Sequence, residues 1–142
     1  MVEIIGLLVG RRISEVVCGA PSGSVFYLEF PDGDEAFCVN CAWRLDHGEH
    51  VLTGWRESND GSDSPLVSGL RKLTGATIEA VDTPMIGAIR IIFSSGHALF
   101  LLCDLTPQYD QEGDANWKYL DPANNKAYLM DRHLTLKEVP YE

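Results

Sequence analysis

The stretch from Gly87 to Asp104 constrains the fold more than any other part of the chain, because it has the pattern of two β-strands joined by a tight turn. Apolar residues alternate with other residues from 88 to 93, and the Ser-Ser-Gly sequence at 94–96 supplies turn residues. The segment 98–103 is almost continuously apolar, which is typical of a strand covered on both faces. The sequence therefore predicts a β-hairpin here.

The same pattern occurs earlier in the chain. Shifting the hairpin back by 63 positions places it on residues 24–41, so that Phe26 corresponds to Ile89 and Phe37 corresponds to Phe100. Each hairpin is preceded by a similar short strand and followed by a strand that contains tryptophan. These flanking segments are 10–17 and 43–46 for the first copy, and 75–81 and 117–121 for the second.

Each copy ends with an apolar strand, Val51–Trp55 in the first and Ala127–Met130 in the second. Two units are too few for a stacked repeat array, which needs about three or more. The sequence therefore predicts two pseudo-repeated antiparallel β-meanders, at about 10–55 and 75–131, that share one core.

A short helix is predicted between the two units, at about 64–74. A serine and a proline at 64–65 fit its start, three leucines follow at i, i+4 and i+7, and Gly75 fits its end. The fold class is therefore α+β, mainly β, in a single domain over 1–142. Residues 4–9 are expected to form a short helix or strand, and residues 134–142 an edge strand or a tail.

The charge of the chain limits its partners. The formal net charge is −10, from 21 acidic and 11 basic residues. Nucleic-acid binding needs clustered lysine and arginine, which this chain lacks, whereas a basic protein surface would be attracted to it. No segment approaches the roughly 18 apolar residues of a membrane-spanning helix, and the first ten residues lack the pattern of a signal peptide. Four cysteines then indicate a reducing, cytoplasmic location.

Two long acidic loops are the candidate partner-binding segments. Loops of this length in compact domains are uncommon and are often functional. The alternative for any single cluster is a solvated surface that promotes solubility. The predicted partner-binding residues are Glu57, Asp60 and Asp63 in the first loop and Tyr109, Asp110, Glu112 and Asp114 in the second.

The sequence predicts no catalytic residue. Ser94, Ser95, His97 and Asp104 are the residue types of a hydrolase triad, but the G-x-S-x-G elbow is absent and the serines fit a hairpin turn. We therefore expect a protein that is not an enzyme and needs no cofactor.

A metal or small-ligand site is the alternative function. Cys38 and Cys41 have the spacing of a zinc knuckle or redox pair, and His47 and His50 follow closely. In a continuous strand, however, residues i and i+3 point to opposite faces, so buried cysteines without bound metal are the favoured interpretation. The matching tryptophans 43 and 117 fit a buried core pair better than a ligand-stacking pair.

The chain resembles small bacterial proteins of uncharacterised function, some of which are similar to immunity proteins of toxin–immunity pairs. The resemblance covers about residues 10 to 131. It is carried by Trp43-Arg-Leu45, Leu70-Arg-Lys-Leu-Thr-Gly75, Ile78-Glu-Ala-Val81, the strand Ala88 to Phe93, Gly96-His-Ala-Leu99 and Trp117. It implies a cytoplasmic protein that binds and blocks a cognate toxin domain. The acidic charge of the chain predicts that this domain is basic. We expect the protein to be a monomer or, through an exposed edge strand, a homodimer.

Overall fold

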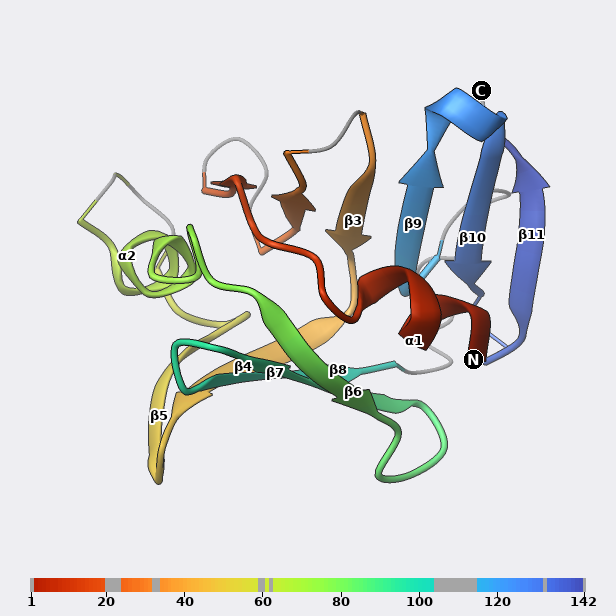
Figure 1. Cartoon of the computed structure of the whole chain (residues 1–142). Helices are drawn as coiled ribbons and strands as arrows, with labels where there is room; N and C mark the ends of the chain where they lie inside the picture. Colours follow the sequence, from red (N-terminus) through yellow and green to blue (C-terminus); the bar gives the residue numbers. More distant parts are fainter. Residues whose placement is uncertain are drawn as a thin grey trace.

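The chain forms two antiparallel β-sheets in the computed structural model, which describes residues 2–19, 24–31, 34–58, 61, 63–103, 115–131 and 133–141. The strands β9, β10 and β11 of one sheet stand upright in Figure 1, and the other sheet runs across below them. The six-stranded sheet has the order β1-β2-β3-β9-β10-β11, and the five-stranded sheet has the order β5-β4-β8-β7-β6. In the six-stranded sheet the strands are β1 (Glu15–Val17), β2 (Phe26–Glu29), β3 (Ala36–Val39), β9 (Trp117–Asp121), β10 (Lys126–Met130) and β11 (Leu136–Pro140). In the five-stranded sheet they are β4 (Ala42–His47), β5 (His50–Gly54), β6 (Ile78–Asp82), β7 (Ala88–Phe93) and β8 (His97–Leu102). The predicted fold class is confirmed.

The two predicted units exchange a hairpin between the sheets. In the first unit, β1, β2 and β3 lie in the six-stranded sheet, while β4 and β5 cross to the other sheet. In the second unit, β6, β7 and β8 lie in the five-stranded sheet, while β9 and β10 cross in the opposite direction. The counterparts are β1 and β6, β2 and β7, β3 and β8, β4 and β9, and β5 and β10. Replacing each strand by its counterpart converts the order β1-β2-β3-β9-β10 of one sheet into β6-β7-β8-β4-β5, which is the order of the other sheet. Only β11 has no counterpart among the described strands.

The segments that enter the two units cross each other at the centre of the fold. The backbone N–H of Gly10 donates to the carbonyl of Ile78 at 2.8 Å, and that of Gly75 donates to the carbonyl of Ile13 at 2.7 Å. Both glycines have positive φ, +90° and +86°, a conformation that side chains disfavour. Since 65 positions separate both Gly10 from Gly75 and Ile13 from Ile78, the two bonds are counterparts of each other.

The strand register corrects one detail of the repeat. Phe37 pairs with Leu28 in the first unit, and Leu99 pairs with Ile91 in the second. The counterpart of Phe37 is therefore Leu99 rather than Phe100, because the connection between the hairpin strands is one residue shorter in the second unit. Phe37 and Leu99 are both fully buried, whereas Phe100 is partly exposed.

The inner faces of the two sheets form one hydrophobic core, in which Trp43 and Trp117 are both buried. The two helices lie against edge strands. Helix α1 (Val2–Leu8) packs on β6, and helix α2 (Pro65–Arg71) packs on β5 and β1. The predicted leucines 66, 70 and 73 are all buried.

Both ends of the chain and the connecting helix can be compared with the sequence predictions. Residues 4–9 belong largely to a helix, and residues 136–140 form an edge strand. Helix α2 is shorter than the predicted range because its end tightens. The backbone N–H groups of Lys72 and Leu73 bond three residues back, to Gly69 and Leu70, in place of the α-helical four.

Candidate interaction surface

The outer face of the five-stranded sheet is apolar along its central strand. On β8, Leu99 and Leu101 point into the core and are buried, whereas Ala98 and Phe100 are partly exposed and Leu102 is 48% exposed. The prediction that this run is covered on both faces is therefore wrong. The run is continuous because the outer residues are apolar as well, although antiparallel sheets of this kind usually present polar side chains to water.

Neighbouring strands extend this apolar surface. Phe100 lies between Arg44 on β4 and Arg90 on β7, and Leu102 lies between Ala42 and Ala88. Figure 1 shows this sheet across the lower part of the molecule, and both α-helices lie on its upper side. We name the surface the outer patch, and it consists of Ala42, Ile92, Ala98, Phe100 and Leu102, while Ala88 beside Leu102 is buried.

Two ion pairs border the outer patch. Arg44 bonds Asp46 through two nitrogens, each 2.9 Å from a carboxylate oxygen, and its guanidinium carbon lies 4.9 Å from the centre of the Phe100 ring. On the other side, Arg90 bonds Asp82 through two nitrogens, one of them at 3.1 Å. Each of these two arginines is therefore neutralised by an aspartate, although the whole chain has a net charge of −10. An apolar centre with a polar rim is the usual composition of a protein–protein interface.

The acidic loop residues are only partly within the described chain. Glu57 and Asp63 are exposed, and the structure brings them to the same end of helix α2. The carbonyl of Ser58, next to Glu57, accepts from the backbone N–H of Leu66 at 3.2 Å, and Asp63 lies just before the helix. The other predicted partner-binding residues, Asp60, Tyr109, Asp110, Glu112 and Asp114, lie outside the described residues.

The acidic residue Glu35 is bonded within the fold. Glu35 accepts hydrogen bonds from Arg11 and from the Tyr119 hydroxyl, and Arg11 also donates to that hydroxyl at 2.8 Å. Arg11 in addition lies 4.4 Å above the Phe30 ring. Burial, followed by the bond to Glu35, raises the pKa of Tyr119. This cluster connects three distant segments, so no local sequence pattern could have revealed it.

The cysteines have different neighbours from those that the spacing of Cys38 and Cys41 suggests. Cys41 and Cys103 are hydrogen-bonded to each other, and this bond together with burial raises the pKa of Cys41. Cys38 instead lies 3.5 Å from the amide oxygen of Asn40 and bonds Tyr27. Cys38 and Cys41 thus have separate neighbours. Among the residues that the structure describes, no group of three or more potential metal ligands is present.

His47 and His97 lie side by side near the β7–β8 turn, and His50 pairs with His47 across the β4–β5 turn. The rings of His47 and His97 stack with centroids 4.4 Å apart, and the Ser95 hydroxyl is 2.7 Å from Nδ1 of His97. Burial, followed by the charges of His47 and Lys72, lowers the pKa of His97. Ser94 accepts from the backbone N–H of Thr77 at 2.9 Å. These contacts stabilise the turn, and Asp104 lies outside the described residues.

None of the helices formed by the described residues is both long enough and apolar enough to cross a membrane. Comparison with known proteins finds no matching family model, no significantly similar curated protein and no significantly similar solved structure.

Proposed function

We propose that this chain is a non-enzymatic, cytoplasmic binding protein that neutralises a cognate bacterial toxin by direct contact. The outer patch is the observation that carries the proposal. It supplies the centre of the interface, and the acidic surface attracts a basic toxin domain. The resemblance to immunity proteins supplies the class of partner.

The composition of the outer patch suits protein binding. Phe100 is a large aromatic side chain at the middle of an open sheet, and aromatic and arginine residues contribute most of the energy in such interfaces. The guanidinium groups of Arg44 and Arg90 are already neutralised by Asp46 and Asp82. A partner therefore covers this surface without enclosing an unpaired charge.

The net charge of −10 acts at longer range. Exposed carboxylates such as Glu57 and Asp63 raise the rate at which a basic partner associates, and salt screens this effect. The outer patch then determines how slowly the complex dissociates.

If the proposal holds, a toxin gene should lie directly upstream of this chain's gene, and the test uses the C-terminal domain that such a gene encodes. Surface plasmon resonance measures its binding to the wild-type chain and to Phe100→Glu, which we expect to bind about 30-fold or more weakly. The matched control is Leu129→Glu. Leu129 is also partly exposed, but it lies on β10 of the other sheet, and its substitution should leave affinity within about twofold.

Circular dichroism melting of both variants shows whether they are folded. If folded Phe100→Glu binds and protects cells as well as the wild type, the outer patch is not the interface.

The double variant Glu57→Lys/Asp63→Lys should slow association at low salt and have little effect at high salt. No binding of that toxin domain by the wild-type chain would refute the function itself.

A further inference from the structure

The core of the first unit closes fully over its tryptophan. The Phe26 ring meets Trp43 edge to face with centroids 5.0 Å apart, and the indole Nε1–H of Trp43 donates to the carbonyl of Ser24 at 2.8 Å. One aromatic ring and one backbone carbonyl thus fill the space and satisfy the only polar atom of the indole.

In the second unit, the described residues leave the matching place open. By the repeat, Ile89 replaces Phe26 and Gly87 replaces Ser24 next to Trp117. The carbonyl of Gly87 accepts instead from the backbone N–H of Cys103 at 2.7 Å. Trp117 is fully buried, and its Nε1–H has no hydrogen-bond acceptor among the described residues. A buried donor without a partner is rare and requires an explanation.

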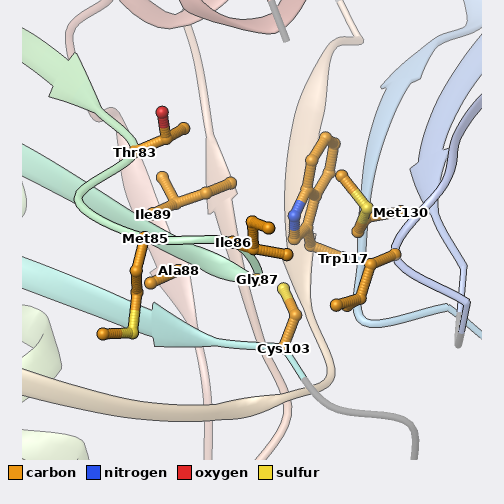
Figure 2. Close-up of a pocket in the computed structure, with 10 residues that line it drawn as sticks. Thr83, Met85, Ile86, Gly87, Ala88, Ile89, Cys103, Trp117 and Met130 are labelled. Carbon is orange, nitrogen blue, oxygen red and sulfur yellow. The ribbon is translucent and has the colours of Figure 1, made fainter.

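A cavity of about 360 Å³ lies beside this indole. Its volume is at the lower end of the range for small-molecule sites. Figure 2 shows the indole nitrogen on the edge of the ring that faces Ile86. The described lining contains no charged residue and one hydroxyl side chain, Thr83. Its other members are Met85, Ile86, Gly87, Ala88, Ile89, Cys103, Trp117, Met130 and Leu134.

The mouth of the cavity carries two apolar side chains that are exposed. Met85 and Ile86, in the connection between β6 and β7, are 67% and 90% exposed. Such exposure is unfavourable for two large apolar residues in sequence, and a bound apolar molecule would remove part of it.

We propose that this cavity binds a small neutral molecule, mainly aliphatic, with one carbonyl oxygen that accepts the Trp117 Nε1–H. The apolar lining selects the aliphatic part. The unsatisfied indole donor selects the oxygen. A carboxylate is disfavoured because the described lining offers no cation and the chain has a net charge of −10. This proposal does not depend on toxin binding, although Ala88 lines the cavity and also pairs with Leu102 of the outer patch.

Two-dimensional ¹⁵N–¹H NMR tests the proposal with 2-heptanone, heptane and heptanoate, which share one chain length. The ketone should shift the indole N–H signal of Trp117, identified with Trp117→Phe, and leave those of Trp43 and Trp55 in place. We expect the ketone to bind about tenfold more tightly than either other compound, as one added hydrogen bond predicts. An unmoved Trp117 signal, or equal affinity for ketone and alkane, would refute the proposal.

Two variants locate the site. Ile89→Phe gives the second unit the ring that fills the first, so ketone binding should be lost, while Ile92→Phe on the outer face of the same strand should bind normally. Ile86→Glu places a charge at the exposed mouth and should weaken binding without any effect on folding. Normal ketone binding by folded Ile89→Phe and by Ile86→Glu would place the ligand elsewhere and overturn the assignment.

Discussion

Arg12 and Thr77 form an isolated antiparallel bridge, and each is the counterpart of the other in the repeat. A residue can pair with its own counterpart only on a two-fold axis. The bridge therefore marks the centre of an approximate two-fold symmetry that exchanges the two units. Cys41 and Cys103, which also follow equivalent strands, meet each other in the same way.

The glycines on either side of this crossing should be equally sensitive. Gly10→Ala and Gly75→Ala should each lower the free energy of unfolding by about 1–2 kcal/mol, because both have positive φ while an added Cβ meets no atom within 4 Å. Urea unfolding measures the change. Gly6→Ala is the control, since this helical glycine has the same open space without positive φ, and alanine there should be neutral or stabilising. Unequal effects at the two crossing positions would contradict their equivalence.

Helix α2 depends on Gly69 for its close packing on β5. A Cβ at this position would lie 2.6 Å from Cγ2 of the buried Thr53. Gly69→Ala should therefore destabilise the protein by about 1–3 kcal/mol, although alanine is the better helix former. Thr53→Ser removes the opposing methyl group. In that background the same substitution should cost much less, and a double-mutant cycle without coupling would contradict this contact.

The Arg11–Glu35–Tyr119 cluster should respond unevenly to substitution. Tyr119→Phe removes one hydroxyl but leaves Arg11 and Glu35 paired, so we expect a loss of about 1–2 kcal/mol. Glu35→Gln removes the charge that opposes Arg11 at a mostly buried position and should cost about 3 kcal/mol. Thermal and urea unfolding give both values. Tyr141→Phe near the end of the chain is the control. A larger effect for Tyr119→Phe than for Glu35→Gln would reverse this interpretation.

Stability in acid should depend on Asp131. Burial alone would raise its pKa, but backbone N–H groups of Thr135 and His133, together with Lys137, lower it overall. A lowered carboxyl pKa stabilises the fold above the unfolded value of about 3.8, and this contribution is lost as the pH falls through the folded value. Asp131→Asn should cost about 1–2 kcal/mol at pH 7 and less near pH 2. An equal loss at both pH values would contradict a charge-dependent role.

His97 should titrate below the ordinary histidine pKa of 6.5. Its neutral form is favoured in the fold, so it contributes stability above pH 6.5 that is lost as the pH falls toward its folded pKa. Proton NMR of the imidazole follows the titration. His47→Gln should raise the midpoint, because it removes the stacked ring whose charge opposes protonation. Burial remains in that variant, so a complete return to 6.5 is not expected.

Local pattern predicted much of this fold. Alternation and turn residues located β7 and β8, leucine spacing located α2, and the second copy of the pattern revealed the two units. The exchange of hairpins was not predictable. It depends on the short connection at Asn40 and Cys41 directing the chain across to the other sheet, and no periodicity reports which sheet a strand joins.

The apolar outer face of the five-stranded sheet was missed for a related reason. An apolar run such as 98–102 has the same sequence whether a second layer or water covers its outer face. Pairing of Cys41 with Cys103 likewise requires the tertiary fold, because these residues lie in different units. The acidic loops were identified from composition, but only Glu57 and Asp63 among their predicted binding residues are described.

The hairpin exchange also determines how this protein can form during synthesis. Each sheet contains strands from both units. The edge of β3 that pairs with β9 therefore has no partner until β9 has been synthesised. We infer that neither unit reaches its final form alone. Assembly should then be slow and occur in one step, since the pairings that complete each sheet join residues far apart in the chain.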